Sequence, residues 1–529
     1  MKKPSVDLFQ LIKSLSMSEK RYFKLYTSGK GGKEQNVSAT LFDAIDEQKE
    51  YDELAIRVRF KGENFVKRFD RAKQNLYEAV LKSLTAYHAD ASAASKLKEL
   101  LQRIRILYDK GLQDQCEKLI DIACRLADKY QNYFYKTEIL KWKLDIVRRK
   151  NFSNATEKSI NEIEIALFDA IEKNKKIQEY NFLAARLSTT RLKIGAPRTN
   201  TNLAKYTSII ENPLLLSQRE PPSYNASVYF YQCYALYFQA KADYVNGLPY
   251  IEKYVNLVRT HPHQIAEDQQ VYVSALTWLC IFQIRLRRYP EALVSIKELK
   301  ALPIRSEFVK KRSLFFTANN ELNIYILNGQ FELGLKWINE NSAYLNSLQR
   351  EKSKYLNRRH LHTFSAIFDI FFGVQQYKNA KYWLNIILNN TDAHFNPEVQ
   401  CFSRIENVIL HYEIGDQEQL EHITRSTYRF LYKRERLYKL ETIILSFIRK
   451  KMPHIVTDKQ RIDAFKELRS AIEIIAKDPF QRKALEYFDI LSWLTSKIED
   501  RPFAEVVKER AKKEIALARR EQPLAKRKK

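Results

Sequence analysis

Residues 288–299 read RYPEALVSIKEL, and they are the clearest copy of a helical unit that recurs through the middle of this chain. Tyr289 opens the unit, and Ala292, Ile296 and Leu299 follow it at three, seven and ten places. That spacing puts an aromatic, a small and two apolar side chains on one face of a helix. A helix pair of this kind cannot bury its apolar face alone, so the pattern predicts that successive pairs stack on one another.

Related units follow at similar distances along the chain. The residues nearest the predicted turns are Leu248, Tyr289, Phe331, Tyr377 and Gln417, at intervals of 41, 42, 46 and 40 residues. Glycine is scarce, with 11 residues in the whole chain, and this scarcity favours long helices over turn-rich folds. The sequence therefore predicts an all-α protein, an α-solenoid of stacked antiparallel helix pairs with a period of about 42 residues.

Three regions are expected along the chain. Residues 1–90 predict an N-terminal helical domain or cap, residues 91–480 the α-solenoid of degenerate repeats, and residues 481–529 terminal helices with a basic tail.

Several local signals place helix boundaries within these regions. Ser16 and Glu19 have the spacing of a capping box at the start of a helix. A long helix is expected from about residue 63 to residue 87, and a turn is expected near Asn246 and Gly247.

The repeats resemble tetratricopeptide repeats. Gly329, Phe331, Gly334 and Ile338 stand where that family has a turn glycine, an aromatic residue, a small residue and a packing position. The resemblance implies a helical scaffold, although the family's usual period is about 34 residues. The opening of the chain, with the stretch EKRYFKL at residues 19–25, looks like bacterial helical-repeat proteins and implies no particular activity.

Bulk composition narrows the class of protein. The formal net charge of the 529 residues is +27, and so basic a surface attracts acidic proteins, nucleic acids and other polyanions. The five cysteines form no C-x-x-C pair, as expected of reduced core residues. Neither a signal peptide nor an apolar run of spanning length is present, so we expect a soluble cytoplasmic protein with no membrane span.

The sequence offers little support for catalysis. The glycine-rich stretch at residues 28–33 lacks the preceding strand and the Ser or Thr of a phosphate loop. The histidine pairs at residues 261–263 and 360–362 lack the i, i+4 spacing and the further ligands of a helical metal site. We therefore predict no enzyme activity, no catalytic residue, no cofactor and no metal.

A basic stripe is the main candidate for binding. Arg425, Arg429, Lys433 and Arg436 recur at intervals of four, four and three, so they share one face if the helix is unbroken. Tyrosines stand beside them, and the pattern fits either a phosphate-pairing surface or a solvated helix with buried tyrosines. A similar basic cluster contains Lys354, Arg358 and Arg359.

Residues 38–75 have the spacing of a helix-turn-helix. Lys67, Arg68 and Arg71 are basic residues that a DNA-reading helix would use. We favour a helical cap with a basic solvent face here, because Phe65 and Phe69 must be buried.

These observations leave two functional hypotheses. The first is a non-enzymatic scaffold that docks a protein partner, expected to be acidic, on an α-solenoid surface. The second is an RNA- or DNA-binding helical-repeat protein whose basic stripes contact phosphates. The sequence leaves the partner's identity, the pathway, the oligomeric state and the binding face open.

Overall fold

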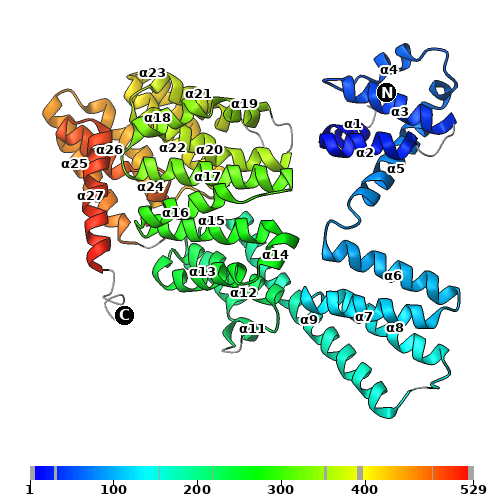
Figure 1. The fold of residues 1–529 in the computed structure, drawn as a ribbon. Helices are drawn as coiled ribbons and strands as arrows, with labels where there is room; N and C mark the ends of the chain where they lie inside the picture. The colour runs from blue at the N-terminus through cyan, green and yellow to red at the C-terminus, as the bar shows by residue number, and fades with distance from the viewer. Residues whose placement is uncertain are drawn as a thin grey trace. The chain divides into compact units, whose positions relative to one another are not determined.

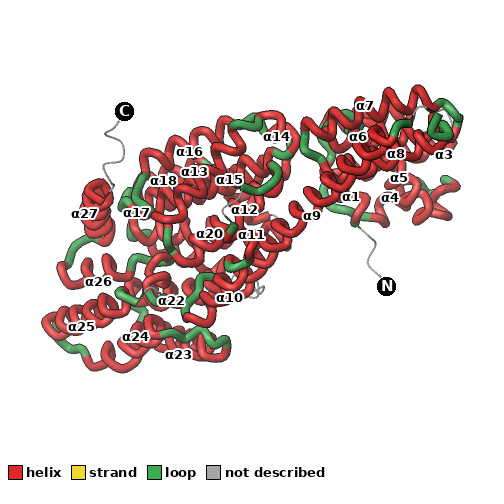
Figure 2. Tube along the Cα trace, turned by 90° about the horizontal axis from the view of Figure 1, so that it is seen from below, coloured by secondary structure: helices red, strands yellow, loops and turns green. Residues whose placement is uncertain are grey.

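The computed structural model describes residues 6–28, 33–153, 155–217, 220–350, 354–389, 397–478 and 480–521. This part of the chain is all-α, with 27 α-helices, short 3-10 and π segments and no strand (Figures 1 and 2). None of its helices is long and apolar enough to cross a membrane. The glycine-rich stretch falls largely on residues 29–32 and the end of the basic tail on residues 522–529, both outside the described residues.

The chain forms two compact units, Met1–Asn174 and Lys175–Lys529, here called unit 1 and unit 2. Helix α9 (Glu157–Ile194) contains the boundary between them. The domain limits expected at residues 90 and 480 remain predictions.

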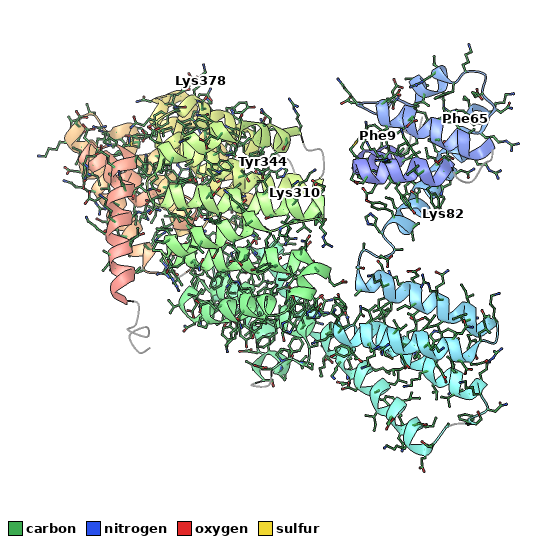
Figure 3. All side chains as sticks on the ribbon, in the orientation of Figure 1. Phe9, Phe65, Lys82, Lys310, Tyr344 and Lys378 are labelled. Atoms are coloured by element: carbon green, nitrogen blue, oxygen red, sulfur yellow. The ribbon has the colours of Figure 1, made fainter. Side chains whose placement is uncertain are left out.

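Unit 1 begins with a small helical core. Its helices are α1 (Asp7–Ser14), α2 (Met17–Ser28), α3 (Lys33–Glu47), α4 (Glu53–Arg59) and α5 (Phe69–Tyr87). Ile12, Phe23 and Phe42 are fully buried, and the partly buried rings of Phe9 and Phe65 pack against the same cluster (Figure 3). Burial of these apolar side chains stabilises the core.

Two local predictions for unit 1 have different outcomes. The capping box at the start of α2 is confirmed, because Glu19 N–H donates to Ser16 Oγ over 3.3 Å and Ser16 N–H donates to Glu19 Oε2 over 2.7 Å. The long helix expected from residue 63 is wrong at its start. Asn64–Arg68 is a 3-10 segment, and α5 begins at Phe69, whose ring is 2% exposed.

The rest of unit 1 is a stack of longer helices. They are α6 (Ala93–Asp109), α7 (Gln113–Lys129) and α8 (Tyr133–Arg149), and each packs on the next. Leu97, Ile104, Ile120 and Ile139 form the buried seam between them.

Unit 2 contains the helices that carry the repeats. They are α12 (Tyr224–Lys241), α13 (Tyr244–Arg259), α15 (Gln269–Arg285), α16 (Tyr289–Ala301), α17 (Glu307–Leu327), α18 (Phe331–Glu340), α20 (Lys354–Gly373), α21 (Tyr377–Leu388), α22 (Pro397–Ile414) and α23 (Gln417–Lys433). Helices close in the chain pack together: α13 contacts α12 and α15, α17 contacts α15, α16 and α20, and α22 contacts α21 and α23. Figure 1 draws α13, α15, α17 and α20 as successive layers of this unit.

The remaining elements complete unit 2. They are α10 (Asn200–Ile210), α11 (Pro213–Leu216), α14 (Pro262–Glu267), α19 (Ser342–Arg350), α24 (Lys439–Ser446), the π segment η2 (Phe447–Lys451), the 3-10 segment η3 (Met452–His454), α25 (Asp458–Ala476), the 3-10 segment η4 (Arg482–Glu486), α26 (Ile490–Glu499) and α27 (Phe503–Glu521).

The residues that define the repeat are buried, as the pattern predicts. Tyr289 is 5% exposed, Ala292 is fully buried, and Phe331 is 2% exposed. Gly334 contacts the side chain of Ile370 on α20 so closely that a Cβ at this position would collide with it. The small residue in the pattern is therefore required by the close approach of two helices.

The same type of turn joins the two helices within each pair. A residue with a left-handed backbone stands two places before each second helix: Ala242, Arg287, Gly329, Gln375 and Gly415, with φ of 55°, 59°, 66°, 59° and 80°. In four of these turns the next N–H donates to a carbonyl five residues back, as from Arg288 to Gln283 over 2.8 Å and from Gln330 to Tyr325 over 2.8 Å. This bond satisfies a carbonyl at the end of the first helix of the pair.

The turn expected near Asn246 and Gly247 is wrong by one helical turn. Helix α13 begins at Tyr244, so both residues lie inside it and Tyr244, not Leu248, corresponds to Tyr289. Gly247 is needed for packing instead, because a Cβ there would meet Phe282 at 2.5 Å and Phe238 at 2.6 Å. A glycine used for close approach of helices was mistaken for a turn glycine.

Helix α27 lies across the turns of the repeats. Gly329 packs on the backbone of Ala504 and Lys508, which leaves no room for a Cβ. Farther along, Glu514 pairs with Arg287 over 2.7 Å. The C-terminal helix therefore contacts two pairs that are far from it in sequence, whereas a simple array would have contacts between neighbours only.

The segment after α9 is also held by distant residues of unit 2. The Arg198 side chain, 5% exposed, donates to Glu441 over 3.1 and 3.3 Å and to Gln481 over 3.1 Å. Ala196 N–H donates to Glu398 Oε1 over 2.8 Å. These buried contacts fix the beginning of unit 2 against its last third. Removing either Arg198 or Glu441 would leave the charge of the other buried and unpaired, which would lower stability.

Candidate functional site

Helix α23 presents a basic face to solvent. Leu420, Thr424, Thr427 and Leu431 are buried and fix the opposite face of the helix. Asp416 caps its N-terminus by accepting from Gln419 N–H over 3.1 Å. The packing therefore determines which side chains point outward.

Three of the four predicted stripe residues lie on this exposed face. Arg425, Arg429 and Lys433 are exposed. Arg436 does not join them, because α23 ends at Lys433 and Glu435 turns the chain with φ of 55°. Arg436 instead donates to the carbonyl of Ile194 over 3.1 Å, so it has a structural partner.

Two of these three charges have no counter-ion among the residues that the structure describes. Arg425 pairs with Glu421 one helical turn away, over 2.6 Å. Arg429 and Lys433 form no ion pair with any described residue. Their charges are thus available to an external anion, whereas that of Arg425 is partly compensated.

Two exposed tyrosines stand beside the basic residues. Tyr428 is 36% exposed and Tyr432 is 67% exposed. Their ring centroids are 6.2 Å apart and the ring planes differ by 8°. The sequence left open whether these tyrosines are buried, and the structure places both on the surface.

Arg449 extends this surface and was missed by the sequence analysis. It comes from η2, which packs on α23, and its guanidinium lies 5.6 Å from the Tyr428 ring centroid. Lys450 and Lys451 follow it and are exposed. The run of three basic residues was visible in the sequence, but its position beside α23 depends on the fold. We call Arg425, Tyr428, Arg429, Tyr432, Lys433 and Arg449 the α23 surface.

A second arginine pair beside α23 is structural. The guanidinium groups of Arg404 and Arg434 lie 3.5 and 3.8 Å from the ring centroid of Phe430. Burial lowers the pKa of Arg404 to about 10. Cation–π contacts on one ring hold these two guanidinium groups next to α23, although Arg434 as a whole is exposed.

The other predicted basic residues lie elsewhere. Lys354, Arg358 and Arg359 belong to the start of α20, and their side chains lie outside the described residues. Lys67, Arg68 and Arg71 are exposed in unit 1, at the 3-10 segment and the start of α5. Their role in binding DNA remains a prediction.

Several basic neighbours of Lys67 are already neutralised. Arg57 and Lys73 both pair with Glu53, over 2.8 and 2.7 Å, and Arg59 pairs with Glu47 over 2.5 Å. Surface pairs of this kind reduce the charge that a nucleic acid would meet.

Cysteine and histidine side chains form no recognisable metal centre in the described part of the chain, where no group of three ligands comes together. All five cysteines are free thiols. Burial raises the pKa of Cys233 and of Cys280 to about 12, so neither is a ready nucleophile.

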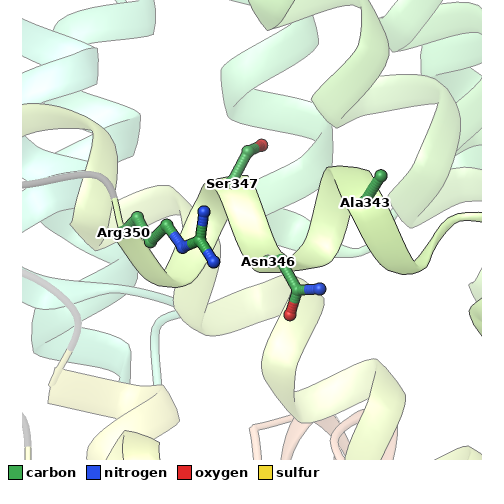
Figure 4. A pocket seen from close by; sticks show the side chains of 4 residues that line it. All are labelled: Ala343, Asn346, Ser347 and Arg350. Atoms are coloured by element: carbon green, nitrogen blue, oxygen red, sulfur yellow. The ribbon is translucent and has the colours of Figure 1, made fainter.

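A shallow recess on α19 is lined by Ala343, Asn346, Ser347 and Arg350 (Figure 4). All four residues come from one helix, and the recess is open to solvent. It lacks the convergent polar groups from several elements that a small-molecule site needs.

No known protein family, curated protein or solved structure matches this chain.

Proposed function

We propose that the helix pairs of unit 2 stack antiparallel as a tetratricopeptide-like α-solenoid, and that this array is a non-enzymatic scaffold which docks an acidic partner protein. The repeated left-handed turns and the packing of each helix on the next support this arrangement. The α23 surface is the proposed docking site.

The observation that carries the proposal is the pair of uncompensated charges on α23. Arg429 and Lys433 are exposed and have no ion pair within the described residues, and exposed tyrosine rings stand next to them. Arginine and tyrosine are enriched in protein interfaces, because they offer large contact areas and hydrogen-bond donors. Carboxylates of an acidic partner would pair with the free guanidinium and ammonium groups.

Charge reversal at Arg429 tests this proposal. Arg429→Glu is expected to weaken the binding of a fluorescent glutamate-rich peptide about tenfold, because one charged contact becomes repulsive. Fluorescence anisotropy at low salt measures the affinity.

Lys82→Glu is the matched control, because Lys82 is exposed on α5 of unit 1 and the net charge changes by the same amount (Figure 3). It should leave peptide binding unchanged. Equal losses in the two variants would mean that the peptide senses net charge alone, and the docking site would then be rejected.

Nucleic acid is a second candidate, favoured by the exposed rings of Tyr428 and Tyr432 on a basic face. Such rings stack on bases in proteins that bind single strands. A labelled oligonucleotide titrated at several salt concentrations tests it, because phosphate contacts give a steep fall of log affinity with log salt. Tight, salt-dependent oligonucleotide binding that Tyr432→Ala abolishes, with no binding of the acidic peptide, would favour this second function.

A further inference from the structure

Unit 1 has a groove where α8 ends and α9 begins. Its volume is about 360 Å³, and residues of α7, α8, the connecting segment and α9 line it. Leu140 of α8 and Ile163 of α9 are 4% and 6% exposed, and Val147 and Ala166 add further apolar surface from the same two helices. Because several elements form its walls, unlike the recess on α19, a groove of this size and lining can hold a small molecule.

Phe152 lines this groove from the segment between the two helices. Both Phe152 and Asn151 have a left-handed backbone, with φ of 56° and 52°, which is uncommon for a bulky residue. The N–H of Phe152 donates to the carbonyl of Val147 over 3.1 Å and so ties the segment to the end of α8. The Phe152 side chain is 53% exposed, and an apolar ligand in the groove would bury more of it.

Four charged side chains line the groove, and two of them are already paired. Lys150 lies 2.8 Å from Asp114 and 2.9 Å from Glu117. Lys143 of α8 and Glu162 of α9 are exposed, and neither forms an ion pair with a residue that the structure describes. The groove therefore offers one unpaired ammonium and one unpaired carboxylate, which come from different helices.

These two unpaired charges determine which ligands the groove favours. A ligand with only a negative charge would pair with Lys143 but would leave Glu162 unpaired and repel it, and a ligand with only a positive charge would do the reverse. A ligand that has both charges satisfies both side chains.

We propose that the groove binds a small zwitterion with an apolar body, of the amino-acid class. The ligand carboxylate pairs with Lys143, and the ligand ammonium pairs with Glu162. Its apolar part lies on Leu140, Ile163 and Phe152. The site belongs to unit 1 and does not depend on the function of the α23 surface.

Titration calorimetry of the full chain at low ionic strength tests the proposal with three probes that share a phenylethyl body. Phenylalanine has both charges, phenethylamine has only the ammonium, and phenylpropanoate has only the carboxylate. Phenylalanine should bind at one site per chain and about tenfold more tightly than either of the others, because each of them leaves one charge of the groove unpaired.

Neutral variants test the two charges separately. In Lys143→Met, phenylalanine should bind no more tightly than phenethylamine, and in Glu162→Gln it should bind no more tightly than phenylpropanoate. Lys141→Met and Glu164→Gln are the matched controls, since both residues are exposed on the same two helices and neither lines the groove. These controls should leave the affinities for all three probes unchanged.

Three results would overturn the proposal. They are no binding of phenylalanine, equal binding of the three probes to the wild type, or an unchanged preference for phenylalanine in both Lys143→Met and Glu162→Gln. Arg429→Glu should leave the binding of phenylalanine unchanged, so failure of this groove and failure of the α23 surface are distinguishable.

Discussion

Two carboxyl groups in unit 2 lack hydrogen bonds that ionised groups need. Glu406 is 1% exposed, and among the described residues neither of its carboxyl oxygens has a hydrogen-bond partner, nor has Oδ1 of the half-buried Asp369. Burial raises the pKa of Glu406 to about 8. Burial, and then the charge of Glu406, raises the pKa of Asp369. Glu406 therefore holds a proton at neutral pH that the unfolded chain would release.

This proton uptake makes stability depend on pH in a defined direction. The folded-state pKa of Glu406 lies above its ordinary value of 4.5, so its contribution is fully present below about pH 4.5 and is lost as the pH rises through about 8. The free energy of unfolding should fall over this window, because the Glu406 carboxylate becomes charged in a buried site. Urea unfolding followed by circular dichroism, at a series of pH values, measures it.

Glu406→Gln should flatten that fall and exceed the wild type in stability at pH 8, since an amide stays neutral. Glu418→Gln, at an exposed position on α23, is the control and should keep the wild-type profile. An identical pH profile in Glu406→Gln and wild type would contradict this assignment.

At the level of single elements, some left-handed turns have a residue that is less favourable for stability than glycine would be. Gln375 has φ of 59° before α21 and is exposed, and a non-glycine residue in this conformation costs about 1 kcal/mol. Gln375→Gly should therefore raise the free energy of unfolding by about 1 kcal/mol. Arg287 is a poorer choice, because its side chain pairs with Glu514.

Thermal and denaturant unfolding check this prediction. Gln376→Gly is the control, one place later in the chain, where φ is −85°. It should not raise the free energy of unfolding, because glycine has no conformational advantage at a negative φ. A loss of stability in Gln375→Gly would mean that the turn is held by side-chain contacts of Gln375.

The sequence predicted the elements well wherever one helix face had to be buried. Tyr289, Ala292 and Phe331 could be assigned to the core because their spacing alone fixes which face of the helix they share. Gly247 could not be assigned correctly, because a turn and a close helix contact both favour glycine. The end of α23 before Arg436 was missed for a similar reason, since no glycine or proline marks it.

The candidate sites were harder to predict, because they depend on distant parts of the chain. The local spacing of Arg425, Arg429 and Lys433 was enough to place them on one face. Arg449 could not be added to them without the packing of η2 on α23.

On the scale of the whole molecule, unit 2 is more than a row of neighbouring pairs. Helix α27 contacts turns far from it in the sequence, and Arg198 links the start of the unit to Glu441. Contacts of this range join distant helices into one cooperative body, whereas nearest-neighbour arrays unfold piecemeal. We therefore expect the buried clusters of successive repeats in unit 2 to behave as one seam that unfolds together.

Hydrogen exchange of Ala292→Arg, followed by mass spectrometry, tests that seam most directly. Ala292 is fully buried and Leu293 beside it is 45% exposed, so Leu293→Arg is the matched control. We predict that Ala292→Arg accelerates exchange in α15, α16 and α17 and lowers the melting temperature, as a buried charge costs about 4 kcal/mol or more. Leu293→Arg should leave both unchanged. Wild-type exchange and melting in Ala292→Arg would contradict the account.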